Sequence, residues 1–270
     1  VGISNADMIY EIPAEGGITR MMAIFSHLYD VESVGSIRSL RPYYLSVALS
    51  YDAIVIHAGG SEQAYSDVKT YNADHLDGVR DGNTSSMFYR DASRGQHGSE
   101  HTLFFHGANV EALVDQYKFR TEHESSYKTG LNFADNAVDQ CTGGAAENVQ
   151  VTFNTSKSTS FTYSGKYTAV QYKADYKDGA TGEAVPFTNL LILSADMKTV
   201  DSYGRLAVDL IGSGTGYFVT GGKYVPIKWA RSDINSCFTY TLEDGTALNL
   251  SRGTTYVGVI PTNGGSANFS

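Results

Sequence analysis

Arginine is unevenly distributed in this chain, and its positions are the first sign of chemistry. Before residue 110 there are six arginines but one lysine, Lys69, although the whole sequence has ten of each. A planar guanidinium binds carboxylate or phosphate through paired donors, whereas lysine suits a solvated surface. Arg38 and Arg41 lie three residues apart in SIRSLRP, where a helix is expected to begin, and a helix N-terminus also attracts anions. This pattern predicts an anion-binding site.

Residues 6–60 contain further charged residues among segments whose apolar character is typical of core strands. They are Glu11, Glu15 and Arg20. An unpaired charge inside such elements is costly. Two interpretations stay open. Either these residues join Arg38 and Arg41 in binding an anionic ligand, or the acids pair with the arginines and only hold loops together.

A second candidate segment is FYRDASRGQHGSEHTLFFH, residues 88–106. Its three histidines, His97, His101 and His106, raise the question of a metal site. Spacings of four and five residues would need a loop to bring them together, and the segment is too rich in Gly and Ser for a rigid helical site. We therefore predict no metal and no cofactor. The preferred interpretation is that Arg90, Asp91 and His101 bind the same ligand as Arg38 and Arg41, and the alternative is solvated loop histidines.

Other motifs give weaker signals. GSGTGYFVTGG resembles a phosphate loop, but strand-forming residues follow it where a dinucleotide loop needs a helix. It is predicted to form turns on either side of a strand. The sequence has no GxSxG, so Ser-His-Asp catalysis has no support. Cys141 and Cys237 could form one long-range bridge or remain separate thiols.

Composition limits the class of protein. The chain has 270 residues, of which 41% are hydrophobic and 12% aromatic, and this describes a globular protein of one large or two ordinary domains. A net charge of −9 argues against nucleic-acid partners, which need a basic face. No apolar run is long enough to span a bilayer. Any export signal or membrane anchor is expected to precede Val1.

The first half is predicted to mix strands and helices. Strands are expected at 8–12, 19–27, 31–38 and 52–57, and helices at 62–71 and 107–118. A further helix, capped by Ser39, is expected to hold Pro42 in its first turn and to continue through Leu49. A polar, Gly-rich stretch at 122–148 marks a domain boundary. Beyond it, nine short apolar segments separated by turns such as TGG and EDG predict strands. The expected fold class is α+β, with a mixed α/β domain (1–130) packed against a mostly antiparallel β domain (145–270).

The chain resembles the YerB-like lipoproteins. Their N-terminal domain is matched by ADMIYEIPAEGGITRMMAIF, VGSIRSLRPYYLSVA and YDAIVIHAGGSEQAY. Their C-terminal domain is matched by FTNLLIL, GSGTGYFVTGGKYVPIKWAR and LEDGTALNLSRGTTYVGVIP. This resemblance covers most of the chain in the right order. It implies a two-domain protein, exported by a Gram-positive bacterium and held to the membrane by an N-terminal lipid, whose activity is uncharacterised.

Positions that match the family's motifs include every candidate site residue. They are Glu11, Glu15, Arg20, Arg38 and Arg41 in the first motifs, and Arg90, Asp91 and His101 in the middle one. Two departures are seen. Thr102 follows His101 where the family has Asn, and residues 172–189 lack the family's arginine and histidine. The anion site would therefore rest on the first domain alone.

Three functional classes follow from these observations. The favoured one is an envelope protein that binds a cell-wall glycan, a lipid-linked phosphate or a partner protein through its arginines. The alternative is an enzyme similar to the LytR-CpsA-Psr phosphotransferases, because Asp7 precedes SIRS much as their aspartate precedes an arginine-rich turn. Such an enzyme would need a long lipid groove and Mg²⁺ held by carboxylates. The third class is a purely structural module with internally paired charges.

Two Asn-Thr-Ser sequences, at Asn83 and Asn154, fit a glycosylation signal, but in an exported bacterial protein they are predicted to be turns.

Overall fold

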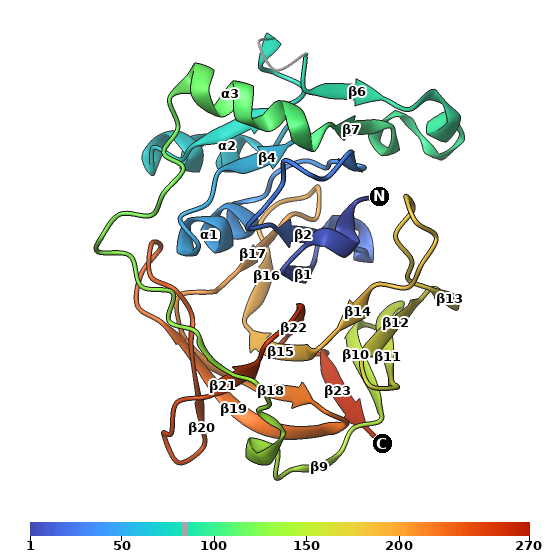
Figure 1. Ribbon diagram of the computed structural model, residues 1–270, viewed down its shortest axis with the longest axis vertical. Helices are drawn as coiled ribbons and strands as arrows, with labels where there is room; N and C mark the ends of the chain where they lie inside the picture. The colour runs from blue at the N-terminus through green and yellow to red at the C-terminus, as the bar shows by residue number, and fades with distance from the viewer. Residues whose placement is uncertain (83–85) are drawn as a thin grey trace. The chain divides into compact units, whose positions relative to one another are not determined.

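The computed structural model describes residues 1–82 and 86–270 (Figure 1), so the predicted turn at Asn83 lies outside the described residues. The class is α+β with mostly β content. Backbone contacts divide the chain into two compact units. Unit 1 comprises Val1–Asn5, Phe25–Lys128 and Gly179–Thr181. Unit 2 comprises Ala6–Ile24, Thr129–Asp178 and Gly182–Ser270.

Unit 1 contains the longer helices and two small sheets. Its helices are α1 (Pro42–Ser50), α2 (Glu62–Thr70) and α3 (Val110–Tyr117). Its strands are β3 (Val34–Gly35), β4 (Val55–His57), β5 (His75–Asp77), β6 (Phe88–Arg90) and β7 (Leu103–Phe105). Strands β4 and β5 pair in parallel, and β3, β7 and β6 form an antiparallel sheet. Leu76, Met87, Phe105 and Leu113 pack together in the core.

Helix α1 has Pro42 in its first turn as predicted, but the predicted cap is wrong. The N-cap residue is Arg41, and it makes no side-chain cap hydrogen bond. Ser39 lies two residues before the N-cap position, because its segment is extended and pairs with a loop. The Leu40 N–H donates to the Gly59 carbonyl at 2.9 Å, and Leu40 forms an isolated bridge with Gly60. The strand predicted at 31–38 is correspondingly reduced to β3.

Helices α2 and α3 follow from local signals. Ser61 caps α2 by accepting the Ala64 N–H at 3.2 Å. Helix α3 buries its apolar face, but the predicted first turn, Gly107–Asn109, is a 3₁₀ turn. Gly107 has no space for a side chain, because a Cβ there would lie 2.2 Å from the carbonyl oxygens of Leu28 and Val31.

Unit 2 is built almost entirely from strands. They are β1 (Met8–Pro13), β2 (Thr19–Ile24), β8 (Asn132–Ala134), β9 (Gly144–Ala145), β10 (Asn148–Asn154), β11 (Lys157–Tyr163), β12 (Tyr167–Gln171), β13 (Ala174–Asp175), β14 (Pro186–Phe187), β15 (Asn189–Ala195), β16 (Met197–Thr199), β17 (Leu206–Val208), β18 (Gly212–Thr220), β19 (Lys223–Arg231), β20 (Thr239–Leu242), β21 (Asn249–Ser251), β22 (Thr255–Pro261) and β23 (Ser266–Phe269).

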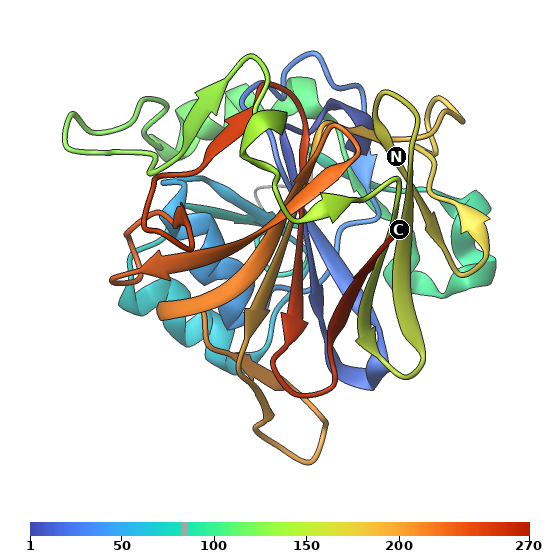
Figure 2. The same ribbon diagram turned by 90° about the horizontal axis from the view of Figure 1, so that it is seen from below.

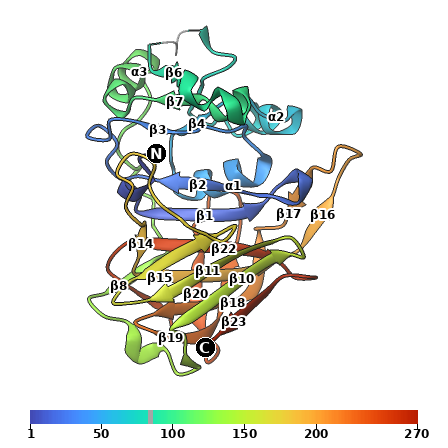
Figure 3. The same cartoon turned by 90° about the vertical axis from the view of Figure 1, so that its right-hand side faces the viewer.

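Two main sheets account for most of these strands (Figures 2 and 3). The larger has the order β2-β1-β22-β15-β18-β19-β20, with β9 also paired to β19. The smaller has the order β13-β12-β11-β10-β23, with β14 paired to β12. The larger sheet is not wholly antiparallel, because β22 runs parallel to both β1 and β15.

Strand β1 explains why the compact units differ from the sequence ranges 1–130 and 145–270. It pairs with β2 on one side and with β22 on the other. Ile9, Tyr10 and Ile12 are fully buried, as expected for a strand inside a sheet. Residues 6–24 therefore belong to the core of unit 2, although they precede all of α1–α3 in the sequence.

The glycine-rich segment GSGTGYFVTGG is a strand and its closing turn. Residues 212–220 form β18, and Gly221 and Gly222 make the two-residue turn to β19. Both turn residues have positive φ, 59° and 76°, which favours glycine. The prediction of a strand with a closing turn is confirmed, whereas the predicted opening turn is wrong because Gly212–Gly216 already pair with β19.

Substitution of Gly107 tests the packing of unit 1. Gly107→Ala should reduce the free energy of unfolding by about 2 kcal/mol, because the new methyl group would overlap two carbonyl oxygens. The measurement is urea denaturation followed by circular dichroism. Gly95→Ala is the matched control, since a Cβ at Gly95 meets nothing within 4 Å. Equal effects of the two substitutions would contradict this account of the packing.

Candidate functional site

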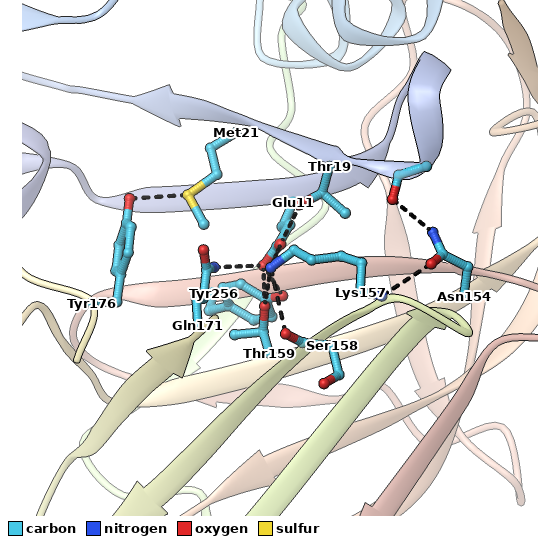
Figure 4. Close-up of polar contacts among 11 residues, drawn as sticks. Glu11, Thr19, Met21, Asn154, Lys157, Ser158, Thr159, Gln171, Tyr176 and Tyr256 are labelled. Carbon is cyan, nitrogen blue, oxygen red and sulfur yellow. Dashed lines mark hydrogen bonds and ion pairs between the residues drawn. The ribbon is translucent and has the colours of Figure 1, made fainter. Parts of the chain in front are cut away.

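The best-connected polar group of unit 2 is the Glu11 carboxylate on β1 (Figure 4). It is fully buried, with 0% of the residue exposed. Two donors reach Oε1: the Thr19 hydroxyl at 2.5 Å and the Lys157 ammonium at 2.9 Å. Three donors reach Oε2: the Tyr256 hydroxyl at 2.7 Å, the Thr159 hydroxyl at 2.9 Å and the Gln171 amide at 3.1 Å.

These contacts make Glu11 an internal link of unit 2. A carboxylate offers about four lone-pair sites, and five donors already converge on this one. The donors come from β2 and β22 in the large sheet and from β11 and β12 in the small sheet. Glu11 therefore joins the two sheets through the core, and no acceptor capacity is left for a ligand.

Lys157 is the cation of this network, and the sequence analysis missed it. It is 3% exposed, and its ammonium also donates to the Thr159 hydroxyl at 3.0 Å. The rings of Tyr172 and Phe153 lie 4.8 and 5.9 Å from it. The missed signal is alternation, because Lys157 shares the buried face of β11 with Thr159 and Phe161. The turn before it, at Asn154, forms as predicted, with the Asn154 side chain accepting the Lys157 N–H at 3.0 Å.

Tyrosines near the Glu11 charge resist ionisation. Burial and the negative charge of Glu11 raise the pKa of Tyr256 well above its ordinary value. Tyr176, whose hydroxyl donates to the Met21 sulfur at 3.0 Å, has its pKa raised by the same two causes. A phenol close to a buried carboxylate is thereby held in its neutral, hydrogen-bond-donating form.

The EGGITR motif forms the turn between β1 and β2. Gly16 and Gly17 have φ values of 79° and 73°, which few other residues adopt. Glu15 and Arg20 form an ion pair across the hairpin at 2.7 Å. Asn154 donates its side-chain amide to the Gly17 carbonyl at 3.0 Å, so the turn is attached to the β10–β11 hairpin of the same unit.

In unit 1, Asp77 organises the carboxyl ends of β4 and β5. Its carboxylate accepts the Tyr65 hydroxyl at 2.6 Å, the Gly59 N–H at 2.8 Å and the Val79 N–H at 2.9 Å. Burial alone would raise the pKa of Asp77, but these hydrogen bonds outweigh it and lower the pKa below its ordinary value. Asp77 therefore holds the loops that follow the two parallel strands.

Two histidines stack beside this carboxylate, and the sequence analysis assigned them no role. His57 Nδ1 lies 2.8 Å from the Gly59 carbonyl, and His57 Nε2 lies 3.0 Å from His75 Nδ1. A carbonyl can only accept, so His57 donates from Nδ1, and its Nε2 accepts the proton of His75. Burial lowers the pKa of His57, which favours this neutral form.

Gly59 connects this cluster to the predicted arginines. Its carbonyl also accepts the Leu40 N–H, and the Arg38 carbonyl accepts the Ala58 N–H at 3.0 Å. The segment from Arg38 to Arg41 is thus held against the end of β4. Arg41 itself is buried and donates to the Leu40 carbonyl at 2.9 Å, so its guanidinium is turned toward the backbone.

Arg38 extends from this segment to the second candidate region. Its Nη1 donates to the Glu100 carbonyl at 2.6 Å. Arg90 donates to the neighbouring Ser99 carbonyl and to the Thr102 hydroxyl, each at 2.8 Å. Two arginines therefore hydrogen-bond to one short turn, Ser99–His101, and Arg90 also binds the hydroxyl of Thr102, which follows the turn.

Positive charge accumulates around that turn. The pKa of His101 lies below its ordinary value, first because of burial and then because of the charge of Arg38. Glu100 opposes this shift, and His97 and Arg94 add smaller contributions to it. We call Arg38, Arg90 and Arg94 the cation cluster, and His97 and His101 lie beside it. Asp91 lies at its edge, where it caps the 3₁₀ turn Ala92–His97 by accepting the N–H and hydroxyl of Ser93.

The structure thus divides the predicted site residues between the two units. Unit 1 brings together Arg38, Arg90, Asp91 and His101, with Arg41 on the same segment. Glu11, Glu15 and Arg20 belong to unit 2, where they pair with residues of that unit. Asp7 also belongs to unit 2, whereas SIRS belongs to unit 1, so neither unit by itself contains the arrangement expected of a phosphotransferase.

Three other sequence expectations concern metals, thiols and membrane spans. Across the described ranges 1–82 and 86–270, no three His, Cys, Asp or Glu side chains are grouped so as to hold a metal ion. Cys141 and Cys237 are separate thiols, which decides between the two alternatives left open above. In the same ranges, none of the helices is long and apolar enough to cross a bilayer.

Comparison with known proteins identifies relatives across both halves of the chain. Residues 1–120 match the family described as "Protein of unknown function (DUF3048) N-terminal domain", and residues 149–257 match the corresponding C-terminal domain. A Bacillus subtilis (strain 168) protein named "Putative lipoprotein YerB" is 29% identical over 268 residues, which cover 96% of this chain and 76% of that protein. The crystal structure of YerB from Bacillus subtilis superposes with a TM-score of 0.82 at 26% identity, covering 99% of this chain and 88% of that one.

Removal of the Glu11 carboxylate tests its role as a link. Glu11→Ala should lower the free energy of unfolding by about 3–5 kcal/mol, because the buried Lys157 ammonium would lose its counter-charge. Glu147→Ala is the control, since Glu147 is exposed in the same unit. Chemical denaturation of both variants gives the comparison, and a Glu11→Ala effect no larger than that of the control would show that the link is dispensable.

Alkaline pH tests the state of Tyr256. The native state keeps the phenol protonated above the pH at which the unfolded chain releases it, so the free energy of unfolding should fall as pH rises above about 10. Tyr256→Phe should reduce the total fall between pH 9 and 11 by about 1.4 kcal/mol, an average of about 0.7 kcal/mol per pH unit, because the unfolded phenol is about half ionised at pH 10. Denaturation curves between pH 9 and 11 provide the measurement, with Tyr203→Phe as the exposed control. Parallel slopes in all three proteins would exclude the assignment.

Proposed function

This chain belongs to the DUF3048 family, and on that premise we propose that it is an envelope lipoprotein that binds an anionic ligand through the cation cluster of unit 1. The name of the relative supports the first part, because a lipoprotein is held to the outer face of a membrane by an N-terminal lipid. The second part rests on the geometry of unit 1.

A single contact carries the proposal of anion binding. The Arg38 guanidinium donates to the Glu100 carbonyl at 2.6 Å. Through this contact, the SIRSLRP segment meets the second candidate segment, residues 88–106. The two residues in contact are 62 positions apart in the sequence. Of the side chains around the turn at which they meet, Arg38 and His101 are half-exposed and Arg90 is exposed.

Charge supports the same proposal. The whole chain carries a net charge of −9, yet the arginines Arg38 and Arg90 both bind the Ser99–His101 turn. After burial, the charge of Arg38 is the next largest cause of the lowered pKa of His101. A concentration of cations on an acidic protein attracts anions locally while the remaining surface repels them. Guanidinium groups recognise phosphate or carboxylate oxygens through paired donors, so the ligand class is a phosphate- or carboxylate-bearing component of the envelope.

Arg38→Ala provides the test of this site. Titration with inorganic pyrophosphate at low ionic strength, followed by calorimetry, should show binding to the wild type and a loss of at least about tenfold in the variant, because charged hydrogen bonds contribute about 1.5–3 kcal/mol each. Arg252→Ala is the control for net charge, since Arg252 is an exposed residue of unit 2.

Two outcomes would contradict the proposal. Undiminished binding of pyrophosphate by Arg38→Ala would remove the cation cluster as the site. A loss of about 1.5–3 kcal/mol in stability with no binding in the wild type would instead favour the purely structural alternative, in which Arg38 only holds the Ser99–His101 turn. Release of the lipid monophosphate from a lipid-linked pyrophosphate in the presence of Mg²⁺ would favour the phosphotransferase alternative.

A further inference from the structure

Unit 2 contains a hollow that lies outside every motif assigned above. Its volume is about 710 Å³, which is within the range of about 300–1,000 Å³ typical of small-molecule sites. Its lining comes from the turn between β18 and β19, the segment around β9, and the end of β11. The side chains that matter for its chemistry are Asp139, Thr142, Glu147, Tyr163 and Lys223.

Segments that line this hollow are held together by hydrogen bonds behind its surface. The hydroxyl of Tyr167, which is fully buried, accepts the Gly222 N–H at 3.0 Å and donates to the Ala146 carbonyl at 3.1 Å. The Ala146 N–H in turn donates to the Gly222 carbonyl at 2.7 Å. This closed set of hydrogen bonds fixes the β18–β19 turn against the strand segment β9, and a preformed site loses less entropy on binding.

The glycines of the turn are needed to shape the hollow. A Cβ on Gly222 would lie 3.1 Å from the ring of Tyr163, and one on Gly221 would lie 2.8 Å from a methyl carbon of Val138. The Tyr163 ring therefore packs directly on the backbone and is half-exposed at the side of the hollow. The TGG sequence, which the anion site does not use, thus serves to position an aromatic wall.

The side chains around the hollow suit a hydroxyl-rich ligand. Asp139 and Glu147 supply carboxylate acceptors, and Lys223 supplies an ammonium donor; all three are exposed. Sugar hydroxyls both donate and accept, and the C–H face of a pyranose ring can pack against an aromatic side chain. Two carboxylates to one ammonium make the site net negative, which disfavours the anions proposed for unit 1.

A peptide ligand is less well supported. Peptides are held by apolar anchors in pockets or by pairing with a strand edge. Here Val138 is the one aliphatic side chain larger than alanine among the described lining residues, and the N–H groups of Gly143, Ala146 and Gly222 are already bonded within the unit. We propose that this hollow binds an uncharged oligosaccharide, with Tyr163 as the stacking residue.

Two neutral oligosaccharides serve as probes, chitotetraose and maltotetraose. Each is titrated to about 10 mM, tenfold above a Kd of about 1 mM, into ¹⁵N-labelled protein. At least one should shift the amide resonances of residues 139–147 and 221–223. Tyr163→Ala should weaken binding by at least about tenfold, whereas Tyr203→Ala, an exposed tyrosine of the same unit, should leave it unchanged.

A second variant keeps the test decisive if Tyr163→Ala destabilises the unit. Glu147→Gln changes an exposed carboxylate and should weaken binding several-fold without affecting the fold. Arg38→Ala should bind the saccharides as the wild type does, which separates this proposal from that of the cation cluster. The proposal is overturned if neither probe shifts those resonances, or if Tyr163→Ala and Glu147→Gln both bind the saccharides as the wild type does. It is also overturned if a zwitterionic Glu-Lys-Glu-Lys peptide binds there and the saccharides do not.

Discussion

A buried carboxylate is the constraint on which the architecture of unit 2 depends. Glu11 lies in a strand inside the large sheet, and donors from the small sheet must reach it for the charge to be tolerated. This requirement ties the register of β11 and β12 to that of β1, because Lys157, Thr159 and Gln171 must all face inward. A charged group in a core specifies one arrangement more strictly than apolar packing alone would.

Unit 1 uses a carboxylate in a different way. Asp77 receives backbone N–H groups from two loops and thereby fixes the ends of the parallel pair β4 and β5. Gly59 links this carboxylate to the Arg38–Arg41 segment, because its N–H donates to Asp77 and its carbonyl accepts from both His57 and Leu40. The segment that carries Arg38 is consequently held against the ends of β4 and β5, which would suit the site proposed for unit 1.

Local patterns in the sequence were sufficient to predict the three helices and strand β4 of unit 1, whereas β5, β6 and β7 were not predicted. Helix α2 begins at the predicted residue, α1 has Pro42 in its first turn as predicted, and β4 lies within the predicted range 52–57. The cap of α1 and the length of β3 were predicted wrongly, because both depend on pairing with distant loops. For the site, the gathering of Arg38, Arg90 and His101 in one unit followed the predicted grouping, whereas Lys157, His57 and Asp77 were overlooked. Lysine, histidine and aspartate are ordinary residues in turns and at strand ends, so their types alone did not mark these three positions.

The sequence by itself determined the types of the elements, the turns that require glycine, the family and the bias toward arginine before residue 110. These properties are encoded within a few neighbouring residues. Tertiary structure alone decided that β1 belongs with β22, that Glu11 meets a hydroxyl 245 positions later in the chain, and that Glu11 and Arg38 serve different units. Pairing between distant strands depends on which buried faces and donors fit together, and no local pattern records that fit.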